Sequence, residues 1–269
     1  MARMSRGMST LAMAGAVVAA GLLLLALRRP SADRNWAEDM RILARPAPPT
    51  PGEVRMRDVR NWRYGAGTVL SRDRLDGAWD PGEIQEIWLY EQEFDRRGRF
   101  AHTFVVFEFP ETYGDRRFLG LSMEARREEG ETYSILRGAF RGFEAIHIWA
   151  TEEDLVTRRV VYAGDPVIRY RLVVSPEARS SIFLRMVEET RLLLDNPRWY
   201  NTVTYNCTSS LIRYANESEP GAIPLHYSWV LTGRIDEYLT RLGYLDASST
   251  RTITPEVLLR EGLRVVDGD

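Results

Sequence analysis

The chain contains one cysteine, Cys207, and three histidines, His102, His147 and His226, among its 269 residues. A cysteine attacks a carbonyl carbon as its thiolate, and it then needs a base, usually a histidine, within hydrogen-bond reach. A single cysteine excludes an intramolecular disulfide. Cys207 is therefore either a nucleophile or a small buried apolar side chain, and the residue types alone leave both interpretations open.

Cys207 lies in a stretch that predicts the start of a helix. Polar, cap-competent residues occupy positions 201–208, and an apolar-periodic run follows from Leu211. We expect the helix to begin between Tyr205 and Thr208, with Cys207 in its first turn. Unpaired N–H groups and the helix dipole would there lower the pKa of the thiol below its reference value of about 8.5. Asn206, Thr208 and the backbone N–H groups are candidates for binding substrate or an oxyanion.

The candidate base is His102, which opens a predicted strand. From that position its side chain can project past the end of the sheet toward a packed helix. His147 lies in the middle of another predicted strand, as expected for a core or surface histidine, and His226 is expected to pack in a loop.

A third residue would orient the imidazole and stabilise its cation. Glu124 is the candidate, because the two-residue period of its strand places it on one face with Arg126. An ordinary ion pair from Glu124 to Arg126 or Arg127 is the alternative interpretation. Glu108 and Glu144 are weaker candidates for the same role.

The composition excludes several classes of function. The sequence has no lysine, so all 36 basic residues are arginines, which excludes phosphate-loop NTPases, Schiff-base enzymes and pyridoxal enzymes. The 36 basic and 38 acidic residues nearly balance, so nucleic acid is not an expected partner. The histidines lack metal-ligand spacing, so neither a metal ion nor a cofactor is expected.

The chain divides into three predicted regions. Residues 1–29 are expected to form a transmembrane anchor, because the apolar run from Thr10 to Leu27 has about the minimum length of a spanning helix. A cleaved signal peptide is the alternative interpretation, but the run leads straight into Arg28 and Arg29, which favours a retained anchor. Residues 30–52 are rich in proline and are expected to form a stiff, extended linker. Residues 53–269 form the domain, which a slight excess of positive charge before the apolar run places outside the cytoplasm.

The domain has the pattern of an α+β fold with a mostly antiparallel sheet packed by helices. Strand-like runs come first and helices follow, which argues against a parallel α/β fold. The expected strands are Ile84 to Phe94, His102 to Phe109, Phe118 to Ala125, Phe143 to Trp149, Arg158 to Tyr162 and Val167 to Val174. The expected helices span Ser175 to about Asp195, the segment from Cys207, Asp236 to Leu242, and a segment after Thr254.

Several motifs in one order resemble the Lnb N-terminal periplasmic domain family, over residues from about Arg57 to Leu245. They are Ala-His-Thr-Phe from Ala101, Leu-Ser-Met-Glu-Ala-Arg-Arg-Glu from Leu121, Glu-Thr-Tyr-Ser from Glu131, Thr-Glu-Glu-Asp from Thr151, and Tyr-Asn-Thr through Asn-Cys-Thr from Tyr200. The resemblance maps the signature positions of the family onto His102, Glu124 and Cys207. It implies a location in the bacterial envelope.

The order of histidine, acid and Asn-Cys at a helix start is also similar to the circularly permuted papain-like superfamily, so a permuted papain-like arrangement is suspected.

A Cys-His-Glu hydrolase or acyltransferase acting on an amide or ester in the envelope is the first functional hypothesis. The alternative is a non-catalytic envelope module for assembly, chaperone-like action or binding, in which the Asn-Cys-Thr motif is structural. In either case the expected partners are the membrane, through the N-terminal helix, and an envelope substrate or protein.

Overall fold

The computed structural model describes residues 27–94 and 98–260, together with Met13 and Gly21. Within these residues, ten strands form one sheet in the order β1-β2-β7-β6-β5-β4-β8-β10, with β3 paired to β2 and β9 paired to β7. Among the pairings of these strands, only that of β2 with β7 is parallel. The strands are β1 Arg45–Pro46, β2 Val54–Gly65, β3 Thr68–Trp79, β4 Glu86–Glu93, β5 Ala101–Glu108, β6 Phe118–Arg126, β7 Glu144–Thr151, β8 Val167–Leu172, β9 Arg198–Trp199 and β10 Leu245–Ile253.

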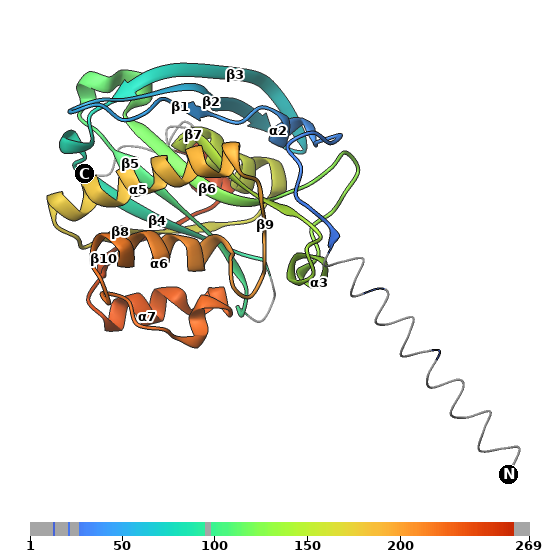
Figure 1. Cartoon of the computed structure of the whole chain (residues 1–269). Helices are drawn as coiled ribbons and strands as arrows, with labels where there is room; N and C mark the ends of the chain where they lie inside the picture. Colours follow the sequence, from blue (N-terminus) through green and yellow to red (C-terminus); the bar gives the residue numbers. More distant parts are fainter. Residues whose placement is uncertain (1–12, 14–20, 22–26, 95–97, 261–269) are drawn as a thin grey trace, which may run out of the picture.

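Helices pack on both faces of this sheet, which gives the expected mixed fold (Figure 1). One face is covered by α5, α6 and α7, and the other by α2, α4 and the π-helical turn η3. The α-helices are α2 Glu38–Arg41, α3 Ile135–Ala139, α4 Glu152–Thr157, α5 Pro176–Asp195, α6 Cys207–Ser218, α7 Ile235–Arg241 and α8 Pro255–Arg260. The shorter turns are η1 Pro81–Glu83, η2 Glu111–Arg116, η3 Arg158–Ala163, η4 Tyr227–Trp229 and η5 Thr232–Arg234.

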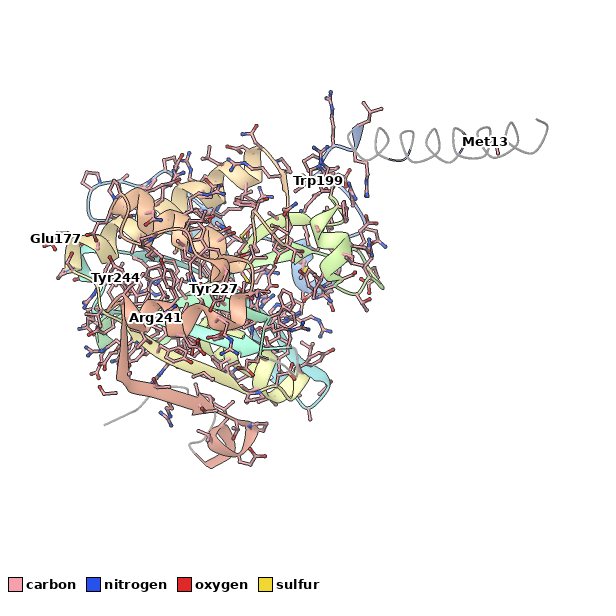
Figure 2. The ribbon with its side chains drawn as sticks, turned by 90° about the horizontal axis from the view of Figure 1, so that it is seen from below. Met13, Glu177, Trp199, Tyr227, Arg241 and Tyr244 are labelled. Atoms are coloured by element: carbon pink, nitrogen blue, oxygen red, sulfur yellow. The ribbon has the colours of Figure 1, made fainter. Side chains whose placement is uncertain are left out.

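Because both faces are covered, the central strands are apolar on both sides. In β5, Val105 and Phe107 face α5 and α6, whereas Phe104 and Val106 belong to the core on the opposite face. The sequence of such a strand is a continuous run of apolar residues, because neither face of the sheet is exposed to solvent. Figure 2 shows Glu177, in the first turn of α5, and Trp199, just beyond its end, at opposite ends of the domain.

One predicted strand is wrong. The run from Arg158 to Tyr162 is helical: α4 continues directly into η3. The Thr151 side chain accepts a hydrogen bond from the Asp154 N–H and caps α4, whose first turn is acidic. The turn ends at Gly164, where φ is +78°. The valines of this run have a strand-like local preference, but the strong cap seven residues earlier decides the conformation.

The proline-rich segment 30–52 also differs from the expected extended linker. Trp36, Met40 and Ala44 are buried, and the guanidinium of Arg126 lies 4.1 Å from the centroid of the Trp36 ring. The segment then adds β1 to the sheet beside β2, where a proline is tolerated because β1 is the last strand on that side of the β1–β10 order. Residues of this segment are therefore part of the packed domain.

Most of the expected anchor, residues 1–29, lies outside the described residues. Among the residues that are described, no helix has the length and apolar character needed to cross a membrane.

Candidate active site

Cys207 is the first residue of α6, as predicted, and its side chain is buried. The helix begins there because Asn206 is its N-cap: the Asn206 side chain accepts a hydrogen bond from the Ser209 N–H at 2.8 Å, and the Asn206 N–H donates to Ser209 Oγ at 2.9 Å. This reciprocal pair fixes the first turn. The Cys207 and Thr208 N–H groups have no acceptor within the helix, since an α-helix leaves its first N–H groups unpaired.

The side chains of Asn206 and Thr208 are committed to the protein. The Asn206 amide donates to the carbonyls of Thr202 and Trp229, each at 2.9 Å. Thr208 Oγ1 lies 3.0 Å from Thr103 Oγ1, and both threonines are buried. These contacts hold the backbone of the helix start in place.

His102 and Glu124 lie together at one end of β5 and β6. Nε2 of His102 is 3.3 Å from Oε1 of Glu124 and 2.7 Å from Oγ of Ser122. Ser122 Oγ in turn donates to Glu124 Oε1 at 2.8 Å. The acid and the serine therefore both lie on the Nε2 side of the ring.

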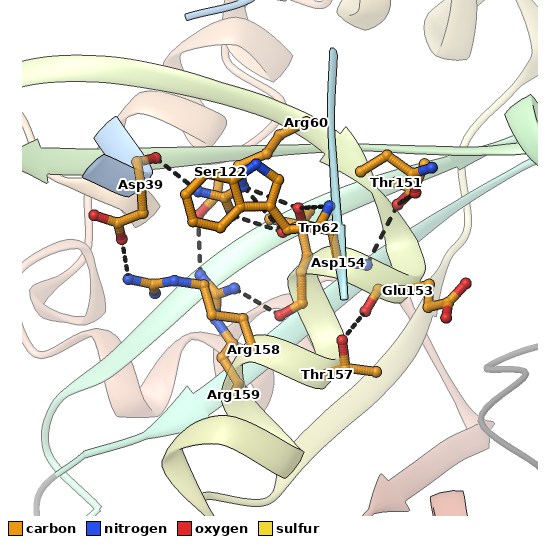
Figure 3. Close-up of polar contacts among 12 residues, drawn as sticks. Asp39, Arg60, Trp62, Ser122, Thr151, Glu153, Asp154, Thr157, Arg158 and Arg159 are labelled. Carbon is orange, nitrogen blue, oxygen red and sulfur yellow. Dashed lines mark hydrogen bonds and ion pairs between the residues drawn. The ribbon is translucent and has the colours of Figure 1, made fainter. Parts of the chain in front are cut away.

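A fourth side chain, Arg159 of η3, completes this cluster from a distant part of the chain. Its guanidinium donates to Glu124 Oε1 at 3.1 Å, to Ser122 Oγ at 3.2 Å and to the Leu155 carbonyl at 2.8 Å. It also lies 4.4 Å from the centroid of the Phe104 ring, and it is buried. Figure 3 shows Arg159 beside Ser122, within a wider network of arginines and aspartates.

Electrostatics make Cys207 and His102 a charged pair near neutral pH. Burial raises the pKa of the Cys207 thiol, but the positive charge of His102, with hydrogen bonds from His102 and Thr103, lowers it from 9.0 to about 7. Burial lowers the pKa of His102, but the charges of Glu124 and Cys207 outweigh it and raise the pKa to about 9. The charge of His102, followed by those of the nearby arginines, holds the pKa of Glu124 well below 4.5 against the effect of burial.

These side chains open into a cavity of about 250 Å³. His102, Glu124 and Cys207 all line it, together with Arg127, Arg158 and Arg159. The aromatic and aliphatic lining includes Phe100, Met123, Tyr133, Ile135 and Tyr200. The three signature positions expected from the sequence therefore meet at one hollow that can receive a ligand.

The chain matches the model of the family described as Lnb N-terminal periplasmic domain over residues 72–233, which is more than half of its length. It belongs to the Lnb N-terminal periplasmic domain family. No curated protein and no solved structure matches the sequence. The matched range contains His102, Glu124 and Cys207, and the family description supports the periplasmic location expected from the sequence.

The other two histidines of this Lnb N-terminal domain lie elsewhere, as predicted. His147 is buried, with Nδ1 2.8 Å from Thr190 Oγ1 and Nε2 3.2 Å from the Tyr214 hydroxyl. Burial lowers the pKa of His147 to about 3, so the ring is neutral. His226 caps η4 and stacks on Tyr238, with ring centroids 3.9 Å apart. Both are packing histidines.

The alternative acids are also engaged outside the site. Glu108 accepts hydrogen bonds from Trp88 and Arg117, and Glu144 accepts one from the Ser31 N–H and pairs with Arg34. Neither Arg126 nor Arg127 is the ion-pair partner of Glu124, because Arg126 donates to backbone carbonyls and Arg127 pairs with Asp39.

Sequence reasoning missed Arg159 and Thr103 in this Lnb N-terminal domain. Arg159 was hidden because its segment was interpreted as a strand, which gave no reason to place it near Glu124. The available signal for Thr103 was its position: Thr103 directly follows His102, just as Thr208 directly follows Cys207. In the structure the two threonine hydroxyls lie 3.0 Å apart.

Proposed function

We propose that this protein is an envelope cysteine hydrolase or acyltransferase that acts on an amide or ester, with Cys207 as nucleophile, His102 as general base and acid, and Glu124 as the orienting acid. The observation that carries the proposal is that a buried thiol at a helix start lines the same cavity as an imidazole held by Glu124 and Ser122, and that each group stabilises the charged form of the other. A thiol nucleophile needs a histidine close to it, and an imidazole held by an acid and a serine at the same cavity supports that role for His102.

In the first step, the Cys207 thiolate attacks the carbonyl carbon and the carbonyl oxygen becomes an oxyanion. The unpaired backbone N–H groups at the start of α6 stabilise this charge, aided by the helix dipole. The His102 imidazolium then donates its proton to the leaving nitrogen or oxygen, the bond to that atom breaks, and a thioester at Cys207 remains.

In the second step, neutral His102 removes a proton from the incoming nucleophile, which attacks the thioester carbonyl. Water gives hydrolysis and releases an acid, whereas an amine or alcohol gives acyl transfer. The tetrahedral intermediate collapses, the thiolate of Cys207 leaves, and the imidazolium is restored. Glu124 keeps the ring oriented and favours its cation throughout.

The chain order supports a permuted papain-like arrangement as part of this proposal. The histidine strand and the acid strand come first, and the Asn-Cys pair at the helix start comes last. The envelope substrate would be a peptidoglycan peptide, a lipoprotein acyl chain or a lipid. We further propose that residues 1–29 anchor the domain to the inner membrane on its periplasmic side, since the apolar run from Thr10 to Leu27 precedes the domain.

The test is the rate of alkylation of Cys207 by iodoacetamide as a function of pH, in the purified full-length protein. Because Cys207 is the sole cysteine of the sequence, the reaction reports on one thiol. We expect the rate to rise through an apparent pKa near 7, well below the value of a free thiol, because the thiolate is stabilised by His102.

His102→Ala should abolish this midpoint, and His226→Ala is the matched control because His226 packs in a loop outside the site. A thiol that stays inert in folded protein up to pH 9, or one whose midpoint is the same in His102→Ala, would refute the proposal. Such a result would favour the non-catalytic envelope module, in which the capping network around Asn206 only stabilises the fold.

A further inference from the structure

The cavity beside Cys207 has a wall of two arginines that the proposed reaction does not use. Arg127 follows the end of β6 and Arg158 begins η3; both line the cavity, and their side chains are 26% and 24% exposed. Both guanidiniums donate to the same atom, Oδ2 of Asp39, so one carboxylate serves two cations. One positive charge of this trio is left without a matching negative charge.

The neighbouring charges do not supply the missing one. Arg60 is bound by the buried Asp154 through a bidentate pair, as Figure 3 shows. In the reactive cluster, the charges of His102 and Arg159 are matched by Glu124 and by the thiolate. Among the described residues that line the cavity, Glu124 is the sole carboxylate. Counted over the described lining residues together with Asp39, the cavity therefore carries a net positive charge when Cys207 is ionised.

The rest of the lining increases the effect of that charge. Phe100, Met123, Ile135 and Tyr133 give the cavity a largely apolar surface, and such a surface lowers the local dielectric and reduces screening. Arginine also presents planar, paired N–H donors that match the oxygens of a carboxylate or a phosphate. A neutral ligand would leave these donors and the unmatched charge unused.

We infer that Arg127 and Arg158 form a subsite for an anionic group, a carboxylate or a phosphate, of the molecule that reacts at Cys207. The assignment to the reacting molecule rests on the proposed function, whereas the binding of an anion in the cavity does not. The subsite would hold the anionic group while the carbonyl reaches the sulfur, so that substrates of this protein would carry a negative charge near the bond that is broken.

Anion binding is tested first, without any use of the thiol. Inorganic phosphate and acetate are titrated by calorimetry into the purified full-length protein at constant ionic strength, which also shows whether phosphate or carboxylate is preferred. We expect Arg127→Gln and Arg158→Gln each to weaken binding roughly two- to fivefold, the range of a partly exposed charge contact. Arg158→Lys keeps the charge and should retain most of the affinity. Arg55→Gln is the matched control, because Arg55 is 74% exposed on β2 and does not line the cavity.

Asp39→Asn gives a prediction of the opposite sign. It frees both guanidiniums from their shared carboxylate, so anion affinity should rise by roughly two- to fivefold. A thermal unfolding curve is measured for each variant to show whether it is folded. The anion affinities are then compared among the folded variants.

The second measurement links the subsite to Cys207. Iodoacetate and iodoacetamide alkylate the same sulfur, but only iodoacetate is anionic. The rate with iodoacetate is divided by the rate with iodoacetamide, and this ratio is compared with the ratio for free cysteine. We expect the ratio to be higher for the protein, to fall in the two glutamine variants and to rise in Asp39→Asn. If Cys207 reacts with neither reagent, the proposed function fails while the titrations still decide anion binding. Equal anion affinity in wild type, Arg127→Gln, Arg158→Gln and Asp39→Asn would overturn the inference, whatever the thiol does.

Discussion

Arg159 and His102 meet at a single oxygen atom of the site. Oε1 of Glu124 accepts a hydrogen bond from Arg159 at 3.1 Å and lies 3.3 Å from Nε2 of His102. The two cations come from different elements, η3 and β5, and the carboxylate between them belongs to β6. Arg159 and His102 therefore share one carboxylate oxygen, and Arg159 helps to hold Glu124 in place beside the His102 ring.

The first prediction separates stability from reactivity at Arg159. Arg159→Gln should lower the free energy of unfolding by about 1–3 kcal/mol, because Glu124, Ser122 and the Leu155 carbonyl lose a buried charged donor. The alkylation midpoint of Cys207 should stay near 7, since His102 supplies the charge beside the sulfur. Urea denaturation and alkylation measure the two effects. Arg72→Gln, which breaks an exposed pair with Glu38, should cost less than about 0.5 kcal/mol.

The second prediction concerns Glu124. Glu124→Gln removes the negative charge that raises the pKa of His102, so the imidazolium should lose its proton at a lower pH. The thiolate then loses its partner, and the alkylation midpoint of Cys207 should move upward from about 7. Glu128→Gln is the control, because Glu128 pairs with Arg34 and is 37% exposed. An unchanged midpoint in Glu124→Gln would show that Glu124 does not act on the base.

The third prediction tests the helix start. Asn206→Ala removes the N-cap of α6 and both amide hydrogen bonds to the Thr202 and Trp229 carbonyls. We expect a loss of about 2–3 kcal/mol in the free energy of unfolding, more than a cap alone contributes. Ser175→Ala, at the exposed N-cap of α5, should cost about 1 kcal/mol in the same denaturation experiment. Equal losses would mean that the two Asn206 amide bonds contribute nothing.

The fourth prediction is a pH dependence of stability that comes from His147. Burial lowers the folded-state pKa of His147 to about 3, from an ordinary value of 6.5. As the pH is lowered, His147 is therefore protonated near pH 6.5 in the unfolded chain but only near pH 3 in the folded chain. The stability that neutral His147 contributes is complete above pH 6.5 and falls as the pH is lowered from 6.5 to 3, by about 1.4 kcal/mol per pH unit.

His147→Gln should remove that part of the slope between pH 6 and pH 4, while lowering stability near pH 7 through its lost bonds to Thr190 and Tyr214. Denaturation at a series of pH values measures the slope. If the slopes of wild type and variant coincide, the ring is not held neutral in the folded state.

Much of the candidate site could be predicted from the sequence, because its signals are local. Cap chemistry around Asn206 predicts the helix start at Cys207, and the apolar runs around His102 and Glu124 predict their strands. The chain has only three histidines, and the mid-strand position of His147 indicates packing, so the sequence favours His102 as the candidate base. These are short-range preferences that the tertiary structure does not override.

The contribution of Arg159 could not be predicted in this way. The valines after it favour a strand, and only the Thr151 cap and the continuous packing of α4 make the segment helical. The docking of Trp36 and Met40 was equally hidden, because the prolines of that segment indicate an extended chain and no local pattern reveals a distant partner such as Arg126. Contacts between residues far apart in the sequence decide both cases.

The position of Asp39 on α2 also has a practical consequence for the design of expression boundaries. α2 belongs to the segment that precedes the first long strand, β2, and a version trimmed to residues 53–269 would lack Asp39 together with Trp36 and Met40. Such a shortened protein would have Arg127 and Arg158 without their shared counter-ion. Its affinity for negatively charged molecules would then be higher than that of the untrimmed chain. Screening for ligands with that fragment would therefore report on two guanidiniums that the untrimmed chain holds against Asp39.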